Sequence, residues 1–431
     1  MKTILNPKKT EWSAILRRPT QSVSEIEELV IEIFNEVKME GDETLKKYTK
    51  QFDGVKIIDL KVAQAEFDEA ETLVSSELKN AIQTAASNIK KFHEAQKTSK
   101  IEIETTPGVI CWQEKRPIEK VGLYIPGGTA PLFSTILMLA IPAKLAGCTE
   151  IVLCTPPDKT GKINPAILYT AKLCGVSQVY KVGGIQAIGA MTFGTESISK
   201  VYKIFGPGNQ YVTVAKQIAT KFGVAIDMPA GPSELLVVAD ESANPAFVAS
   251  DLLSQAEHGA DSQVILVSTS KSLLEEVELE LQNQITNLPR EIIARKALGN
   301  SKLIFVENDK IAIELINEYG PEHFIVCCKD EEYYIRNVVN AGSVFLGKFT
   351  PESAGDYASG TNHTLPTNGY AKQFSGVNLD SFMKSITFQR ISETGILNIG
   401  NAIEVLAEAE GLMAHKKAVT LRLQSLKGNN K

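Results

Sequence analysis

Residues 121–128 read Val-Gly-Leu-Tyr-Ile-Pro-Gly-Gly, a short apolar run that ends in a turn containing proline and glycine. A segment of helix length follows, and the same succession of apolar run, turn and helical pattern recurs downstream. Further apolar runs of this kind occupy residues 151–154, 179–182, 201–205 and 224–226. Short apolar strands that alternate with helices are typical of βαβ units. The sequence therefore predicts a mostly parallel, twisted sheet with helices on both faces.

A second series of apolar runs begins after residue 233. Its members are again separated by segments of helix length, and they occupy residues 235–238, 264–267, 303–306, 324–327 and 344–346. The chain has 431 residues, which is too long for one compact core. We therefore predict an α/β protein with two doubly wound, incomplete Rossmann-like domains and a small helical C-terminal extension.

The predicted domains are not all continuous in sequence. We expect an N-terminal arm at residues 1–20, a domain formed by residues 21–120 and 234–376, an inserted domain at residues 121–233, and a helical tail at residues 377–431. The helices before residue 121 are expected to pack on the later sheet, so that the inserted domain interrupts one larger body. The tail has much apolar surface and few partners close in sequence. We expect it to dock on another body, such as a second subunit.

Composition excludes several classes of partner. The chain carries 45 lysines and arginines against 51 aspartates and glutamates, and charges of both signs are interspersed. Nucleic acid is therefore not an expected partner. Residues 1–12 contain lysines but no apolar run, and no stretch has the length of a membrane span, so we expect a cytoplasmic protein without a membrane partner. The six cysteines lack CxxC spacing, which indicates neither a disulfide framework nor a cysteine zinc site.

The turns after the first series of strands are rich in glycine, at residues 126–128, 183–184 and 206–209, and each precedes a predicted helix. Backbone N–H groups at a helix N-terminus, approached closely through glycine, are suited to phosphate or pyrophosphate. However, the chain has no GxGxxG, and the strand that ends at Cys154 is followed by Thr-Pro-Pro rather than by an acidic residue for a ribose. On the turns alone, nucleotide binding and ordinary turn chemistry both remain open.

Four polar residues could together hold a metal ion. Gln255 and His258 are three apart on a predicted helix, so both side chains leave the same face. Asp356 lies in a long polar loop at residues 350–363, and His415 lies in the helical tail. Two nitrogen and two oxygen donors are compatible with zinc, although glutamine is an uncommon ligand. The alternative is a helix-end cation or a satisfied polar pair, and spacing alone does not decide between these.

Glu322 and His323 are adjacent at the entrance of the predicted strand 324–327. Imidazole titrates near neutral pH and a carboxylate can activate water, so this pair is suited to proton transfer. The alternative is a polar loop edge without a chemical role.

Several runs in one order resemble the histidinol dehydrogenase family, and the resemblance extends from about residue 120 to 415. The runs are Tyr-Ile-Pro-Gly-Gly (124–128), Phe-Gly-Pro-Gly-Asn (205–209), Ala-Gly-Pro-Ser-Glu (230–234), Gln-Ala-Glu-His-Gly (255–259), Gly-Pro-Glu-His (320–323), Pro-Glu-Ser-Ala-Gly-Asp-Tyr-Ala-Ser-Gly-Thr-Asn-His (351–363) and Glu-Gly-Leu-Met-Ala-His (410–415). That family oxidises histidinol twice, through histidinaldehyde, to histidine. The positions that carry the family's function show no departure from its pattern.

The resemblance implies a role for each of these positions. Glu322 and His323 would be the proton acceptors, and the inserted domain would bind NAD. The resemblance implies that one zinc ion per subunit binds to Gln255, His258, Asp356 and His415. It implies that NAD contacts Tyr124, Gln186 and Asn209. The residues implied to contact histidinol are Ser233, Gln255, His258, His323, Asp356, Glu410 and His415. The resemblance also implies a homodimer in which the C-terminal helices complete the partner's site. Whether His415 acts in its own subunit or in the partner stays open, and His363 receives no step.

Three rival functions are compatible with the same residues. Cys327 or Cys328 could be the nucleophile of an aldehyde dehydrogenase, although both continue an apolar strand. A zinc hydrolase could use Glu322 to activate water without a nucleotide. A metal-binding scaffold would hold zinc and turn over nothing.

Overall fold

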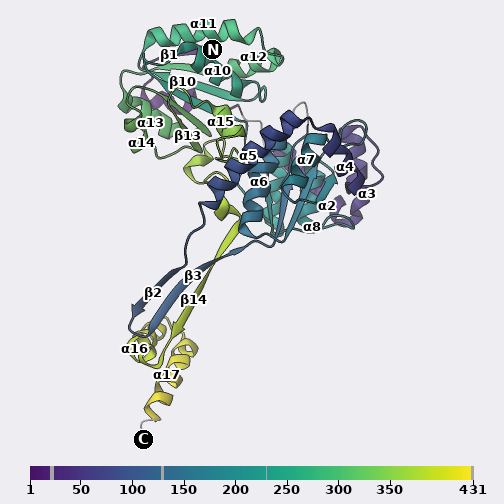
Figure 1. The fold of residues 1–431 in the computed structure, drawn as a ribbon. Coiled ribbons are helices and arrows are strands. Elements are labelled where there is room, and N and C mark those ends of the chain that lie inside the picture. Colours follow the sequence, from purple (N-terminus) through teal and green to yellow (C-terminus); the bar gives the residue numbers. More distant parts are fainter. Residues whose placement is uncertain (20–23, 128–130, 230, 429–431) are drawn as a thin grey trace. The chain divides into compact units, whose positions relative to one another are not determined.

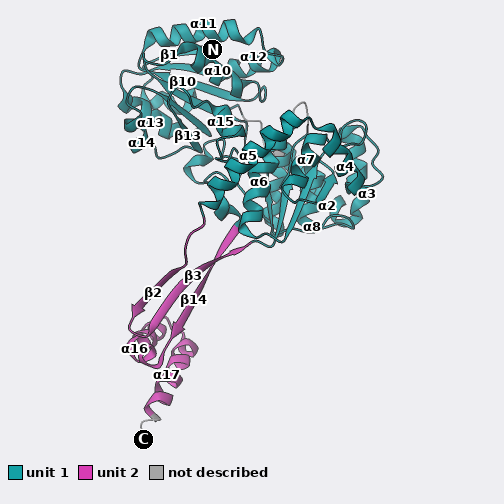
Figure 2. Cartoon of the chain, viewed as in Figure 1, with its two compact units in different colours: residues 1–96, 118–382 teal, residues 97–117, 383–431 magenta. Residues whose placement is uncertain are grey.

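The computed structural model describes residues 1–19, 24–127, 131–229 and 231–428. Gly128 and Ala230, which belong to the runs at 124–128 and 230–234, lie outside the described residues. The chain divides into two compact units, shown in Figure 2. Unit 1 comprises residues 1–96 and 118–382, and unit 2 comprises residues 97–117 and 383–431.

Unit 1 contains a parallel five-stranded sheet in the order β6-β5-β4-β7-β8. Figure 1 shows this sheet with helices beside it. Its strands are β4 (Lys120–Tyr124), β5 (Glu150–Thr155), β6 (Gln178–Lys181), β7 (Lys203–Phe205) and β8 (Ala225–Ile226). The helices between them are α6 (Phe133–Ala146), α7 (Pro165–Leu173), α8 (Gly184–Phe193) and α9 (Gln210–Ala219), and η3 (Thr220–Phe222) precedes β8. The predicted βα rhythm is therefore confirmed, and the strand order is that of the first five strands of a doubly wound dinucleotide-binding sheet.

The early helices pack on this first sheet, and our expectation that they would cover the later one was wrong. They are α2 (Ser24–Glu40), α3 (Asp42–Tyr48), the π-helical turn η2 (Thr49–Asp53), α4 (Gln64–Leu73) and α5 (Ser76–Glu94). Helix α2 buries Ile33 and Phe34 in one core with Ile188 of α8, while α5 buries Ile89 against Leu137 of α6. Helical periodicity identifies the apolar face of a helix but not the surface that covers it. For that reason the sequence could not show which of the two sheets these helices cover.

A second parallel sheet in unit 1 has the order β1-β11-β10-β9-β12-β13. Its strands are β1 (Lys2–Leu5), β9 (Glu234–Ala239), β10 (Gln263–Ser268), β11 (Lys302–Phe305), β12 (His323–Cys327) and β13 (Ser343–Leu346). All residues of β9, β10 and β12 are buried, as expected for strands covered on both faces. The edge strand β1 lies in the segment that we predicted as an arm.

Helices cover both faces of this second sheet. One face carries α10 (Pro245–Ala256), α11 (Lys271–Ile285) and α12 (Glu291–Gly299), and the other carries α1 (Trp12–Ile15), α13 (Asp309–Tyr319) and α14 (Glu331–Asn337). The remaining short elements of unit 1 are η1 (Lys9–Glu11), α15 (Glu352–Tyr357), η4 (Tyr370–Lys372) and η5 (Leu379–Phe382). Two layers of helices around each sheet confirm the predicted α/β class.

Unit 2 is an antiparallel three-stranded sheet followed by a helical hairpin. The strands are β2 (Ile101–Thr106), β3 (Val109–Pro117) and β14 (Met383–Ile391) in the order β14-β3-β2, and the helices are α16 (Glu393–Ala409) and α17 (Met413–Gly428). The helical C-terminal extension is confirmed. We did not predict β14, because its partner β3 lies far away in the sequence and leaves no local signal.

Candidate active site

The neighbouring strand of the second sheet positions the predicted acid–base pair of Glu322 and His323. Strand β12 begins with His323, and its neighbour β9 begins with Glu234. The backbone N–H of Glu234 donates to Glu322 Oε2 at 2.8 Å, and His323 Nδ1 lies 3.1 Å from the Glu234 carbonyl oxygen. Both side chains are buried. The backbone of one residue therefore fixes the Glu322 carboxylate and, if Nδ1 carries the proton, the orientation of the imidazole.

Carboxylates surround the His323 ring. Its Nδ1 lies 3.7 Å from Glu322 Oε2 and 3.7 Å from Glu352 Oε1, and its Nε2 lies 3.4 Å from Asp356 Oδ1. Burial alone lowers the pKa of His323, but the carboxylates of Glu352, Glu322 and Asp356 outweigh burial and leave this pKa well above its usual value. Burial raises the pKa of Glu322 to about 8. These are the perturbed groups expected where protons are transferred.

Glu234 is itself held by an ion pair from the beginning of the chain. Arg18 donates from Nε to Glu234 Oε1 and from a terminal nitrogen to Oε2, the second bond at 2.8 Å. The same guanidinium donates to the carbonyl oxygen of Tyr319 at 2.8 Å and lies 3.9 Å from the centre of the Tyr319 ring. The Glu234 side chain is 1% exposed and that of Arg18 14%. The bidentate pair of Arg18 and Glu234 thus holds the residue whose backbone contacts Glu322 and His323.

Three of the four predicted metal ligands, Gln255, His258 and Asp356, lie beside this pair in one cluster with Glu352. The ligand atoms of His258, Glu352 and Asp356 all lie within 4.8 Å of one another. The Gln255 amide lies between Glu352 Oε1 and the Glu234 backbone N–H. With its nitrogen turned towards Glu352 it donates to that carboxylate, and its oxygen then accepts from the Glu234 N–H at 3.3 Å. His258 follows the end of α10, and so comes from the turn rather than from the helix itself.

The chemistry of this cluster fits a divalent cation such as zinc. Glu322, Glu352 and Asp356 place three carboxyl groups around one imidazole, and a bound cation would stabilise the charged carboxylates that burial of Glu322 and Glu352 disfavours. Asp356 Oδ1 and His323 Nε2 are buried without a hydrogen-bond partner within the described part of the chain. Nitrogen from imidazole and oxygen from carboxylate or amide are donor types that zinc accepts.

Glu352 is a member of this cluster to which the sequence analysis gave no role. We predicted residues 350–363 as a loop, whereas residues 352–357 form the short helix α15. Glu352 and Asp356 are four residues apart and therefore leave the same face of this helix. Burial raises the pKa of Glu352 well above its usual value. The i, i+4 spacing of two acids was the signal that could have identified it.

His363 supports the loop that follows α15. Its Nδ1 lies 2.9 Å from the carbonyl oxygen of Asp356, and its Nε2 lies 3.0 Å from the Thr135 hydroxyl on α6. Burial lowers the pKa of His363. A neutral ring that donates through Nδ1 and accepts through Nε2 satisfies both contacts, so this histidine connects α6 to the metal cluster.

The glycine turns of the first sheet border a cavity of about 630 Å³. It lies at the carboxyl ends of the strands and is lined by Tyr124, Gly127, Pro156, Gly184 and Asn209, among others. The carboxyl ends of a doubly wound sheet are where ligands bind in this fold class. A side chain at Gly127 would collide with Pro156, so glycine is required there by the close approach of two turns.

The three predicted NAD contacts lie at or beside this cavity. The Tyr124 hydroxyl accepts from the Gly184 backbone N–H at 3.1 Å, and burial raises the pKa of Tyr124 to about 12. Asn209 caps α9 through the Val212 N–H at 3.1 Å. Gln186 is buried on α8, two residues beyond Gly184, and its Oε1 has no hydrogen-bond partner among the described residues. A free amide oxygen in such a place is available to a ligand.

The remaining predicted substrate contacts lie in different parts of the chain. Ser233 is half-buried and directly precedes β9. Glu410 follows α16 and His415 lies on α17, both exposed in unit 2. Whether Glu410 and His415 reach the metal cluster remains a prediction.

Burial disfavours the thiolate form of the two cysteines on and after β12. Cys327 ends β12, Cys328 follows it, and both are buried. Burial raises the pKa of Cys327 to about 12 and that of Cys328 further, so neither thiol forms a thiolate near neutral pH.

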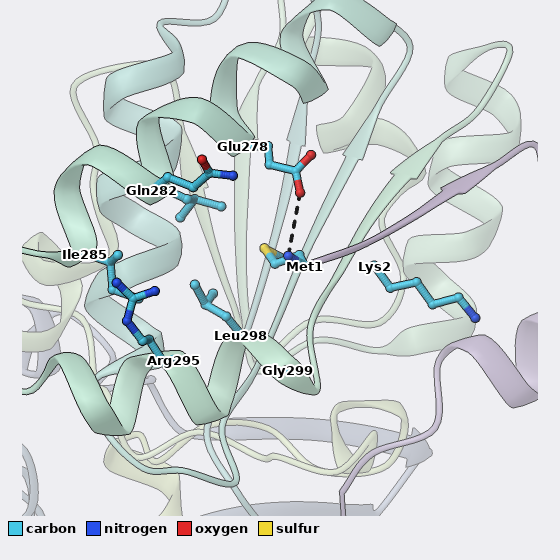
Figure 3. Close-up of a pocket in the computed structure, with 9 residues that line it drawn as sticks. Met1, Lys2, Glu278, Gln282, Ile285, Arg295, Leu298 and Gly299 are labelled. Carbon is cyan, nitrogen blue, oxygen red and sulfur yellow. Dashed lines mark ion pairs between the residues drawn. The ribbon is translucent and has the colours of Figure 1, made fainter.

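Figure 3 shows a second cavity, of about 370 Å³, where the chain's first residues meet α11 and α12. It is lined by Met1, Glu278 and Arg295, among others, and the Met1 amino group lies 3.8 Å from Glu278 Oε1. The residues that line this cavity include none of the predicted site residues. We therefore assign it no part in the chemistry.

Within the described ranges, no helix is both long enough and apolar enough to cross a membrane.

Comparison with known proteins gives one consistent result. The family model described as histidinol dehydrogenase matches residues 16–423. A histidinol dehydrogenase from Bacteroides fragilis is 59% identical over 99% of this chain and 100% of its own length, and one from Haemophilus influenzae is 53% identical over 97% of each. The crystal structure of histidinol dehydrogenase from Elizabethkingia anophelis superposes with a TM-score of 0.97 at 59% identity and covers 99% of both chains.

Proposed function

The chain belongs to the histidinol dehydrogenase family of enzymes, and on this premise we propose that it catalyses the NAD-linked, four-electron oxidation of L-histidinol to L-histidine through histidinaldehyde. This reaction would place it in histidine biosynthesis. The observation that carries the proposal is the buried pair of Glu322 and His323 beside the cluster of Gln255, His258 and Asp356.

We propose that Gln255, His258 and Asp356 hold one zinc ion, with His415 as the fourth ligand. Bound zinc would act as a Lewis acid that fixes the nitrogen atoms of the substrate and so orients its alcohol carbon. Glu352 would keep the Gln255 amide in place through the hydrogen bond that it accepts. Ser233 and Glu410 would contribute the remaining substrate contacts.

His323 would act as the general base in both oxidations, because a bound cation would offset the carboxylates that raise its pKa and leave the ring able to accept a proton. In the first, it accepts the hydroxyl proton while hydride leaves the alcohol carbon, which gives the aldehyde. Glu322 then removes a proton from water as the water oxygen adds to the aldehyde carbon, and protonated His323 returns its proton to the aldehyde oxygen, which gives the hydrate and restores His323 as a base. In the second oxidation, His323 accepts a proton from the hydrate as hydride leaves, which gives the carboxylic acid. Bound NAD would supply the hydride acceptor in each step.

We propose that the cavity beside the first sheet binds NAD. Tyr124, Gln186 and Asn209 would contact the cofactor there, and the backbone N–H groups at the starts of α8 and α9 would face its phosphates. The location at the carboxyl ends of a doubly wound sheet supports this assignment.

We further propose that the active enzyme is a homodimer completed by unit 2. Helices α16 and α17 expose large apolar side chains to a degree that is unusual for a monomer. These side chains are Leu397, Val405, Leu406, Leu412, Met413 and Leu421, each at least 45% exposed. A partner subunit that covers them would bring Glu410 and His415 to a site across the interface.

Mixing two inactive variants tests whether the site is shared. If His415 acts in the partner's site, His258→Ala and His415→Ala homodimers should each be inactive, and subunit exchange between them should restore about one intact site per mixed dimer. Recovery of activity only when both residues are intact in one chain would place His415 in its own subunit.

The reaction itself is tested by counting NADH formed per histidinol consumed. The proposal predicts two NADH per substrate, loss of turnover after chelation and recovery after zinc is restored. Zinc retention without NADH formation would favour a scaffold or a hydrolase and would overturn the proposed function.

A further inference from the structure

Asp53 places a carboxylate in the proposed cofactor cavity that the sequence analysis did not identify. It is the last residue of the π-helical turn η2, and it lines the cavity together with Tyr124 and Pro156. Gly54 follows with a positive φ of 74°, which turns the chain away after Asp53. An early segment of the chain therefore contributes an acid to a pocket built by a later sheet.

One oxygen of this carboxylate is unsatisfied. Asp53 Oδ2 is buried and has no hydrogen-bond partner within the described residues. Burial raises the pKa of Asp53 to about 6, and no cationic side chain in the described ranges offsets this effect. A buried carboxylate oxygen without a donor is unfavourable. A ligand in the cavity that offers hydroxyl groups would remove this penalty.

The position of this segment along the sheet indicates which part of a dinucleotide it meets. Val55, two residues after Asp53, lies 3.6 Å from the Cβ position of Gly161 in the segment that follows β5. Further along, the Val62 N–H donates to the Val179 carbonyl oxygen at 2.9 Å, and the Lys181 N–H on the edge strand β6 donates to the Leu60 carbonyl oxygen at 2.7 Å. Asp53 therefore belongs to the β5–β6 half of the sheet. In doubly wound dinucleotide-binding folds, an acid after the second strand accepts from the adenosine ribose. Here that strand, β5, is followed by Pro156 instead.

We propose that Asp53 accepts hydrogen bonds from the vicinal hydroxyl groups of the adenosine ribose of NAD and thereby disfavours NADP. This inference rests on the proposed function, because it requires NAD in the cavity. A carboxylate accepts from both hydroxyls of a ribose diol, whereas the 2′-phosphate of NADP removes one donor and adds negative charge next to the acid. Asp53 thus supplies, from a different segment, the acid that would distinguish NAD from NADP and that the turn after β5 lacks.

Binding measured without histidinol tests this proposal separately from catalysis. The variant is Asp53→Asn, which keeps the shape and removes the charge, and the matched control is Asp59→Asn, an exposed aspartate six residues downstream. Titration calorimetry with NAD, NADP, ADP-ribose and nicotinamide mononucleotide gives the dissociation constants. Thermal unfolding verifies that each variant is folded, and Asp53→Ser serves as a second variant.

We expect Asp53→Asn to weaken NAD and ADP-ribose binding about 10- to 100-fold, as for the loss of hydrogen bonds to a charged group. Mononucleotide binding should stay unchanged, and the preference for NAD over NADP should shrink by a similar factor. Equal NAD affinity in Asp53→Asn and Asp59→Asn would overturn this inference alone, as would a loss confined to the mononucleotide. A parent chain that binds neither NAD nor ADP-ribose would overturn the proposed function as well.

Discussion

Replacing Arg18 by methionine should destabilise the part of unit 1 that contains the second sheet. Arg18 forms two charge-assisted bonds to Glu234 and one to the Tyr319 carbonyl, and Glu234 is 1% exposed. Methionine keeps the apolar stem of Arg18 but leaves the Glu234 carboxylate buried without a counter-charge. Removing one partner of a buried ion pair costs about 3–5 kcal/mol, which is a 100-fold or larger change in the unfolding equilibrium.

Tryptophan fluorescence during urea unfolding measures this effect locally. The chain has two tryptophans, and Trp12 is buried in the core on the face of the second sheet that carries α13. In a Trp112→Phe background the signal comes from Trp12 alone. Arg17→Met is the matched control, because Arg17 is exposed and adjacent. Arg18→Lys should fall between the two, since lysine cannot form a bidentate pair. An Arg18→Met midpoint equal to that of Arg17→Met would refute the reasoning.

Four further outcomes follow from the site. Glu322→Gln should form one NADH per histidinol instead of two, because water is no longer activated, and the released aldehyde should be detectable by trapping with a hydrazine. Replacing Cys327 and Cys328 by serine should leave turnover largely intact, and a loss above about tenfold would support a mechanism in which a cysteine attacks the aldehyde. His258→Ala should lose bound zinc in elemental analysis while its circular dichroism spectrum is retained. Burial raises the pKa of Asp251 from 3.8 to about 7, so the folded state binds the carboxyl proton more tightly than the unfolded state. The stability of the folded state therefore falls as pH rises between these values. Asp251→Asn should gain more stability over the parent at pH 8 than at pH 5, and an equal gain at both pH values would contradict this dependence.

The two sheets could be predicted because their signal is local. Each buried strand is a short apolar run, and the turn and helix that follow lie within a few residues of it, as in the run at 121–128 that leads to α6. Pairings between distant segments gave no such signal. The edge strand β1 pairs with β11, and β14 pairs with β3, and neither pairing is visible from the residues nearby.

The site was predictable to the extent that its residues lie in distinctive runs. Gln255, His258 and Asp356 were predicted as ligands and do lie in one cluster with Glu352. Two acids were missed. Glu352 lies in one of the runs, and its spacing from Asp356 was a signal that we did not use. Asp53 lies outside the runs, and only the loss of solvent around it marks it. Burial of a single carboxylate depends on segments that arrive from elsewhere in the chain, and a sequence pattern does not contain it.

The pairing of Lys2 with Lys302 also sets an order of events during protein synthesis. Strand β1 is synthesised before the five-stranded sheet, yet β11 beside it emerges only after that sheet has been made. Strand β1 must wait unpaired through that interval, and such long-range pairing is slow and exposes a free strand edge. Arg18 follows that strand closely in the chain. The ion pair that supports Glu322 and His323 is therefore among the last parts of the molecule to be assembled, and a chain interrupted before β11 would contain the five-stranded sheet but neither Glu322 nor His323.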